Sequence, residues 1–252
     1  MNRKAGAPTL VAHRGYAARY PENTLEGITA AMQAGARYIE VDIQLSADGV
    51  PILFHDADLA RTTNASGPVM EYTLAQLRQF CAGEPARFGA QFSSARIPTL
   101  DELITLLSDW PSVTVFLELK EESLAYFNTT TMTDKVLQAS SPLAQRRVLI
   151  SYSTTAIEEI HERDTIKSGW VLRRYDDETR RKASALAPHY LICNFTKLPP
   201  APQPLWPGPW TWVLYEITDP ALARRLYERG AGFIESMDTG AMMKASLFKR
   251  AE

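Results

Sequence analysis

The sequence predicts an α/β protein with a (β/α)8 barrel, on three observations. Strand-like apolar runs alternate with helix-like amphipathic runs along the chain, and a chain of 252 residues has the size of eight strand–helix units. An open, doubly wound sheet is the competing fold, but no Gly-rich dinucleotide-binding motif follows the first strand. The eight core strands are centred near Leu10, Val41, Phe116, Leu149, Val171, Ile192, Val213 and Phe233.

A strand, a helix and a hairpin open the chain. Residues 9–12 (TLVA) predict a short buried strand. Residues 23–35 predict a helix, because apolar side chains recur there at helical spacing before a terminal glycine. Residues 38–45 alternate between apolar and polar, and a following Asp-Gly turn signal leads into a return strand over 51–54.

The alternation of strands and helices resumes after an interruption. Roughly residues 57–97 show no clear period, so we expect a small insertion there, after the second strand. Thr99 and Glu102 form a capping box for a helix over 99–107. A proline-rich loop over 197–209 replaces one helix. The later strands are expected over 114–120, 148–152, 170–173, 190–195, 211–217 and 232–235, and the later helices over 155–163, 177–187, 219–229 and 240–249.

We expect residues 1–252 to form a single domain. Composition and charge exclude some classes of function for it. The 27 basic and 29 acidic residues give a net charge of −2, and no basic field indicates a nucleic-acid partner. No stretch is long and apolar enough to span a bilayer, and no apolar leader precedes the first strand, so we expect no stable membrane insertion. Cys81 and Cys193 lie in unrelated contexts, which favours free thiols in a reducing compartment, the cytoplasm.

Charged residues stand at the ends of several predicted strands, where a (β/α)8 barrel places its chemistry. Such side chains are costly to bury without partners, so packing does not explain them. Where two of them are two residues apart on one strand, they point to the same face of the sheet. In chain order they are His13, Arg14, Glu40, Asp42, His55, Asp56, Glu118 and Lys120.

Three of these residues, Glu40, Asp42 and Glu118, are carboxylates that converge if the barrel closes. Packed together in a low dielectric they repel one another and need a counter-charge. Oxygen ligands suit Mg²⁺, Ca²⁺ or Mn²⁺ better than Zn²⁺, so we expect one divalent metal ion at this cluster. Arg14 and Lys120 beside the metal indicate a site for a phosphoryl group.

His13 and His55 add an acid and a base that titrate near neutral pH. Each group alone has an ordinary alternative, such as exposed carboxylates on an edge strand, a surface salt bridge or a loop histidine. His161 and His189 belong to that ordinary class and receive no role. The combination of charged groups at consecutive strand ends is what favours an active site.

The motifs HRG, PENT, IEVDIQLSADGVPILFHD, RTTNASG, IPTLDEL and FLELK occur in this order. Together they resemble the glycerophosphodiester phosphodiesterase family over the whole chain, most densely from Val11 to Lys120. The resemblance implies a TIM barrel that uses a divalent metal to hydrolyse glycerophosphodiesters to sn-glycerol 3-phosphate and an alcohol. It implies acid/base roles for two residues, phosphate binding for two and metal binding for three, which are His13 and His55, Arg14 and Lys120, and Glu40, Asp42 and Glu118.

The resemblance also covers residues around this set. In the PENT box, it implies that Asn23 caps the first helix and that Glu22 holds Arg14. Near the C-terminus the chain departs from the family, with YEITDP where a WTVND-like segment is common. Tyr215 replaces the tryptophan there and is a candidate substrate contact. Glu216 either selects a cationic head group or faces solvent.

Other activities remain compatible with the same site. One is a lysophospholipase D-like phosphodiesterase, for which Phe88, Phe92, Trp206 and Trp210 would supply an apolar groove. Another is a non-catalytic barrel that binds phosphodiesters, and a third is a barrel aldolase or isomerase, which three clustered carboxylates disfavour. In each phosphodiester case the partner is a small molecule, and the oligomeric state stays open.

Overall fold

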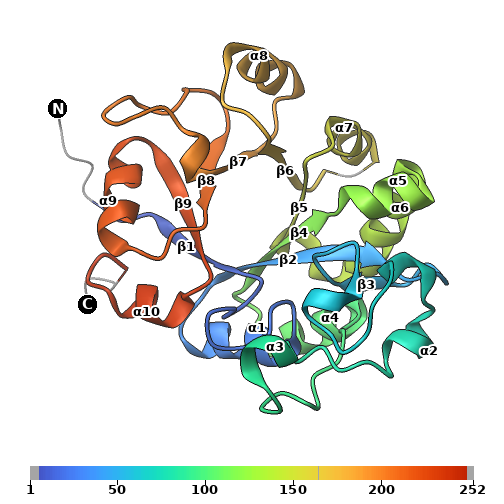
Figure 1. The fold of residues 1–252 in the computed structure, drawn as a ribbon. Coiled ribbons are helices and arrows are strands. Elements are labelled where there is room, and N and C mark those ends of the chain that lie inside the picture. Colours follow the sequence, from blue (N-terminus) through green and yellow to red (C-terminus); the bar gives the residue numbers. More distant parts are fainter. Residues whose placement is uncertain (1–5, 164, 249–252) are drawn as a thin grey trace.

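The computed structural model describes residues 6–163 and 165–248, and it has the predicted (β/α)8 architecture (Figure 1). Eight parallel strands form one sheet whose first strand pairs with both the second and the last, so the sheet closes into a barrel. In order around the barrel, the strands are β1 (Thr9–His13), β2 (Tyr38–Leu45), β4 (Thr114–Leu119), β5 (Arg147–Ser151), β6 (Lys167–Leu172), β7 (Tyr190–Asn194), β8 (Thr211–Tyr215) and β9 (Ala231–Ser236).

Helices surround the strands on the outside of the barrel (Figure 1). The predicted capping box of Thr99 and Glu102 is present at the start of α4. No helix in the described part of the chain has the length and apolar character needed to cross a membrane. The helices around the barrel are α1 (Leu25–Gln33), α4 (Leu100–Ser108), α5 (Glu121–Phe127), α6 (Thr129–Ser140), α7 (Thr154–Arg163), α8 (Asp177–Leu186), α9 (Pro220–Glu228) and α10 (Thr239–Lys244).

The helix predictions were incomplete at two places. Helices α5 and α6 were not predicted, because α5 has only seven residues, too few to show a helical period, and α6 opens with a run of threonines of low helix propensity. Asn128, at a φ of 65°, joins the two helices, and its side chain caps α6. Helix α10 ends at Lys244, short of the predicted end at residue 249, which lies outside the described residues. The β7–β8 connection holds only the short turn η4 (Phe195–Lys197) before its proline-rich loop, as predicted.

Alternate residues of the strands point into the barrel and fill its lower part with apolar side chains. Val11, Phe116, Ile150 and Ile192 belong to this buried inner cluster. Phe233 packs its ring edge against Tyr38 in the same layer. Because the period of a strand is two, the next inward position on each strand lies one layer nearer its carboxyl end. The apolar layer therefore forms a floor beneath the polar residues of the barrel mouth.

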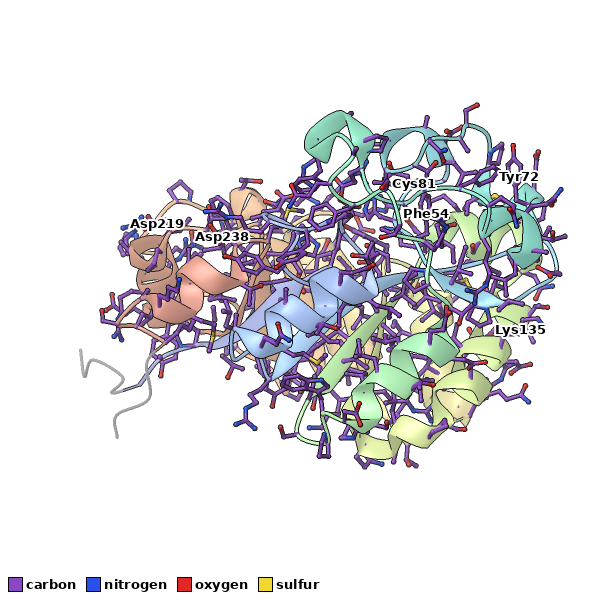
Figure 2. All side chains as sticks on the ribbon, turned by 90° about the horizontal axis from the view of Figure 1, so that it is seen from below. Phe54, Tyr72, Cys81, Lys135, Asp219 and Asp238 are labelled. Atoms are coloured by element: carbon purple, nitrogen blue, oxygen red, sulfur yellow. The ribbon has the colours of Figure 1, made fainter. Side chains whose placement is uncertain are left out.

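The segment between β2 and α4 forms a small structure beside the barrel. Strand β3 (Pro51–Leu53) returns antiparallel to β2, as the hairpin pattern predicted. The short helices that follow are η1 (Leu59–Arg61), η2 (Val69–Glu71), α2 (Leu74–Leu77) and α3 (Pro85–Phe88). Apolar side chains of these helices pack with Ile52 and Phe54 in a hydrophobic cluster that is separate from the barrel core. Figure 2 shows Phe54, Tyr72 and Cys81 grouped in this segment, away from Asp219 and Asp238.

Candidate active site

A cavity of about 250 Å³ opens at the carboxyl ends of the barrel strands. Its floor is apolar, formed by Ile150, Val171 and Ile192 from the inner cluster. Its wall is polar, and most of the charged residues singled out in the sequence contribute to it. The polar and aromatic lining residues are His13, Arg14, His55, Glu118, Lys120, Tyr152, Asn194, Tyr215, Glu216 and Glu235.

Glu40, Asp42 and Glu118 form the predicted carboxylate cluster. Each offers one carboxylate oxygen, and these oxygens lie within 4.8 Å of one another. The sheet register explains the meeting, because Asp42 pairs with Glu118 across β2 and β4, so both side chains point to the same face. Glu40 and Asp42 are 2% and 1% exposed. Such burial excludes the alternative of solvated carboxylates on an edge strand.

Arg14 follows β1 and turns back toward this cluster. Its φ of 55° places the backbone in the left-handed region, and its N–H donates to the Glu40 carbonyl at 2.9 Å. Its guanidinium donates from Nη1 to Glu22 Oε1 at 2.9 Å, and its Nε lies 3.2 Å from Asp42 Oδ2. Glu22 therefore does hold Arg14, as expected from the PENT box. Arg61 from the inserted segment binds the same Glu22 carboxylate.

Asn23 does not cap the first helix, so that expectation was wrong. The N-cap of α1 is Thr24, whose hydroxyl accepts from the N–H of Gly27. The Asn23 side chain instead hydrogen bonds Asp42, with its amide donating to the Asp42 carboxylate. Thr24, the helix cap, and Asn23, the site residue, are adjacent in the sequence. The backbone directs the Thr24 side chain to α1 and the Asn23 side chain to Asp42, so the two residues have different roles.

Lys120 lies at the carboxyl end of β4 and is only 7% exposed. Its ammonium group donates to Glu118 Oε1 at 2.9 Å and lies 3.4 Å from Asp42 Oδ1. Burial opposes its positive charge, but Asp42 and Glu118 outweigh this and raise the pKa of Lys120. Lys120 is therefore a buried, permanently charged cation, and not part of a surface salt bridge.

The carboxylates of the cluster have opposite pKa shifts. Burial opposes ionisation of Asp42, but the positive charges of Arg14 and Lys120 prevail and lower its pKa. Burial, reinforced by the charge of Asp42, raises the pKa of Glu40 well above its usual value. Burial likewise raises the pKa of Glu118. Arg14 and Lys120 therefore neutralise only part of the negative charge of the three carboxylates.

The donor set fits a hard divalent cation. All three cluster residues offer oxygen, which Mg²⁺, Ca²⁺ and Mn²⁺ prefer. Glu40 Oε1 is buried and has no hydrogen-bond partner within residues 6–163 and 165–248. A buried carboxylate oxygen without a partner is costly. A cation bound between the carboxylates would supply that partner and relieve their mutual repulsion.

His13 ends β1 and His55 follows β3, two strands that both pair with β2. His13 Nε2 is 3.8 Å from Glu40 Oε2, and burial, followed by the charge of Arg14, lowers the pKa of His13. His55 Nδ1 lies 2.6 Å from Asp56 Oδ1. Arg61 donates to Asp56 and thereby fixes the carboxylate that orients His55. Both imidazoles line the cavity, so each can reach a molecule bound there.

Gln44 is a supporting residue that the sequence analysis missed. Its side-chain amide donates to the backbone carbonyls of His55 and Asp56, which holds the loop after β3 against the barrel. It is fully buried on the same strand face as Glu40 and Asp42. Glu40, Asp42 and Gln44 alternate with apolar residues along β2, and this pattern could have identified Gln44 from the sequence.

Another part of the cavity lining combines tyrosines and carboxyl groups. Tyr215 lines the cavity, and its hydroxyl group is 2.9 Å from that of Tyr152. Glu216 follows at a φ of 66°, exposed at the rim, and the Asn194 amide donates to its carboxylate. Glu216 is thus solvent-exposed and also lines the cavity, so both alternatives for it stay open.

Glu235 is a fourth carboxyl group at the site that the sequence analysis did not assign. It lies on β9, 4% exposed, and lines the cavity. Burial, with the negative charges of Glu118 and Asp42, raises its pKa to about 8. Its signal was present in the sequence, because position 235 follows the inward-pointing Phe233 by two residues.

The four aromatic residues considered for an alkyl-chain groove do not form one. Trp210 is 8% exposed and belongs to the main hydrophobic core, so this expectation was wrong. Trp206 stacks on Tyr175 with ring centroids 3.8 Å apart. Phe88 and Phe92 pack against each other in the inserted segment. None of the four lines the cavity.

The fold and the site together define a class of protein: a (β/α)8 barrel whose mouth holds buried carboxylates, cations and two histidines. Such a site is suited to a phosphoryl group beside a divalent cation. A family model described as the glycerophosphoryl diester phosphodiesterase family matches residues 13–194. The chain belongs to this family, which confirms the resemblance drawn from the motifs.

Individual relatives support the same placement. A glycerophosphodiester phosphodiesterase of Caldanaerobacter subterraneus is 39% identical over 117 residues, which are 46% of this chain and 47% of that protein. Glycerophosphodiester phosphodiesterase 1 of Bos taurus is 30% identical over 156 residues, 62% of this chain and 46% of that protein. The matched segment thus spans about half the length of these curated relatives.

Solved structures match along nearly the whole chain. A phosphodiesterase of Oleispira antarctica, in complex with its product sn-glycerol-3-phosphate, has a TM-score of 0.82 and 25% identity. The match covers 94% of this chain and 96% of that one. A glycerophosphoryl diester phosphodiesterase structure from Silicibacter pomeroyi, with 22% identity, has a TM-score of 0.81 over 95% of this chain and 93% of that one. The second likeness supports the fold alone.

Proposed function

We propose that this protein hydrolyses glycerophosphodiesters to sn-glycerol 3-phosphate and an alcohol, with a divalent metal ion. The observation that carries the proposal is the buried cluster of Glu40, Asp42 and Glu118 beside Arg14 and Lys120. Family membership and the product-bound structure of the Oleispira antarctica relative support it. The substrate is a small molecule that enters the cavity at the barrel mouth.

Each charged group has a role in this proposal. Arg14 and Lys120 neutralise the non-bridging oxygens of the phosphodiester. Glu40, Asp42 and Glu118 would hold one Mg²⁺, Ca²⁺ or Mn²⁺ ion, whose positive charge stabilises the charge that develops on the phosphoryl oxygens. Tyr215, which lines the same cavity, contacts the substrate.

His13 and His55 transfer the protons. One removes a proton from the nucleophile, which is water or the 2-hydroxyl group of the glycerol, and the other protonates the departing alcohol. The attacking oxygen forms a bond to phosphorus while the bond from phosphorus to the leaving oxygen breaks. Attack by water gives sn-glycerol 3-phosphate directly, whereas attack by the 2-hydroxyl group gives a cyclic phosphodiester. Water then opens this ring by forming a bond to phosphorus as the bond to the 2-oxygen breaks. Asp56 orients His55 for this task through the 2.6 Å contact with Nδ1.

The test is release of glycerol 3-phosphate from a panel of glycerophosphodiesters, with and without EDTA. We expect release that EDTA abolishes and that added Mg²⁺, Ca²⁺ or Mn²⁺ restores. Lysophosphatidylcholine serves as the rival substrate, because the cavity lacks the aromatic groove considered for an alkyl chain. Faster hydrolysis of lysophosphatidylcholine would favour the lysophospholipase D-like activity. Phosphodiester binding without turnover of any substrate would favour the non-catalytic barrel.

We also propose the cytoplasm as the compartment, on the chemistry of the cysteines. Cys81 and Cys193 are both free thiols. Cys193 is buried, and burial raises the pKa of its thiol to about 11, so the thiol stays protonated and unreactive. Retention of both thiols in protein purified from its native source would support this location, and an oxidised pool would contradict it.

A further inference from the structure

We propose that Glu235 recognises the glycerol hydroxyl groups of the substrate and so makes the site specific for glycerol-bearing phosphodiesters. The inference rests on the proposed function and adds a residue that selects the substrate. It begins from the position of Glu235 on β9, two residues after Phe233. Phe233 packs in the barrel interior beside Phe116, so the Glu235 side chain also points inward, one layer nearer the mouth.

The carboxyl group of Glu235 has no hydrogen-bond or ion-pair partner in the described ranges 6–163 and 165–248. The residue is only 4% exposed. Its carboxylate oxygens are not among the enclosed side-chain atoms that lack a partner, so they open onto the cavity. Because Glu235 lines the cavity, a bound molecule can supply the missing partner.

The positions of the cations limit which part of a substrate Glu235 binds. The place of the phosphate is beside Arg14 and Lys120, and Glu235 brings no positive charge for it in either protonation state. Glu235 also lies outside the cluster of three carboxylates whose oxygens are within 4.8 Å of one another. What remains is a neutral hydrogen-bond donor or the head group of the alcohol.

The depth of Glu235 in the cavity decides between a neutral hydrogen-bond donor and the head group. Glu235 is buried, whereas Glu216, which also lines the cavity, is exposed at the rim. A head group that varies in size needs the open rim, and the glycerol of constant size fits the enclosed end. A carboxylate can accept hydrogen bonds from two neighbouring hydroxyl groups, as acidic residues do with ribose in dinucleotide sites. The acceptor is present in either protonation state of the carboxyl group.

The experiment compares two ligands that differ only in hydroxyl groups, sn-glycerol 3-phosphate and propyl phosphate. Their dissociation constants are measured by calorimetry in saturating Mg²⁺ for the wild-type protein, Glu235→Gln and Glu235→Ala. We expect the wild type to prefer glycerol 3-phosphate by roughly 10- to 100-fold, the value of a hydrogen bond to a charged group. We expect Glu235→Ala to lose most of that preference while its affinity for propyl phosphate stays within about threefold.

Two controls keep the outcome interpretable. Glu228→Gln changes an exposed glutamate of α9 and should leave both dissociation constants unchanged. Mg²⁺ affinity of Glu235→Gln, the isosteric variant, shows whether the residue serves the metal instead. Equal weakening of both ligands, a collapse of Mg²⁺ affinity, or an unchanged preference would each overturn the inference. Since binding is measured without turnover, a failure of the proposed hydrolysis is recognised separately.

Discussion

Asn23 and Asp42 hold each other through two hydrogen bonds. The Asn23 amide donates to Asp42 Oδ2 at 2.9 Å, and the Asp42 backbone N–H donates to Asn23 Oδ1 at 3.1 Å. Asn23 adopts a φ of 55°, a left-handed conformation that asparagine tolerates better than most residues. Both residues are buried, so this pairing fixes the orientation of one carboxylate of the acidic cluster.

Replacing Asn23 with alanine should therefore impair both stability and activity. We expect Asn23→Ala to lower the free energy of unfolding by about 1–3 kcal/mol, because the buried Asp42 N–H loses its partner. It should also lower kcat/KM, because Asp42 is no longer held in place. Urea denaturation and steady-state kinetics measure the two effects. Thr24→Ala is the matched control: it removes the helix cap at a cost of about 1 kcal/mol but should leave kcat/KM unchanged.

Removing either imidazole should abolish most turnover. Each proton transfer contributes roughly 10²–10⁴-fold to the rate, so His13→Ala and His55→Ala should each lose about that factor in kcat. Release of glycerol 3-phosphate reports the rate, and thermal melting reports the fold. His161→Ala is the control, since His161 lies on α7 outside the cavity lining. Wild-type rates in both active-site variants would remove the histidines from the mechanism.

Because of Glu235, the free energy of unfolding of the metal-free protein should depend on pH. Its pKa rises from 4.5 to about 8 on folding, so the folded state binds the proton more tightly than the unfolded state. The associated stabilisation is complete below pH 4.5 and is lost as the pH rises to about 8. Glu235→Gln cannot titrate. In EDTA we expect wild type and variant to be similarly stable at pH 5.

At pH 8 the same variant should be more stable than the wild type. One pKa unit corresponds to about 1.4 kcal/mol, so a difference on the order of 2–4 kcal/mol should develop between pH 5 and pH 8. Chemical denaturation at several pH values measures it, and taking the difference between the two proteins cancels the other titrating groups. A difference in unfolding free energy that does not change with pH would contradict the burial of an unpaired carboxyl group at position 235.

Glu216 should influence the choice of head group from the rim. Removing its charge by Glu216→Gln should lower the ratio of kcat/KM for glycerophosphocholine over glycerophosphoglycerol by a few-fold. The effect should be modest and should shrink at high salt, because the carboxylate is exposed and screened. Competition assays at two ionic strengths measure the ratio. A ratio that does not change would mean that Glu216 faces solvent without contacting the head group.

Local sequence signals predicted most of the fold. The eight strands, the hairpin and the Thr99–Glu102 capping box are specified by residues close together in the chain, so periodicity and turn chemistry predict them. Helix α5 was missed because seven residues are too few to show a helical period. Helix α6 was missed because its threonines disfavour a helix locally, and its stability comes from packing around Met132 and Val136. Trp210 was misjudged because its sequence context does not tell a core aromatic from a groove-lining one.

Within the site, the sequence by itself determined which charged groups face the barrel mouth. Residues two apart on a strand share a face, and strand ends of a closed parallel barrel meet at one rim. Only the tertiary structure decided how these groups pair: Asn23 with Asp42, Arg61 with Glu22, and Glu235 with no group in the part of the chain that the structure describes. Such pairings join segments far apart in the chain, and they depend on strand register and loop path, which local patterns do not encode.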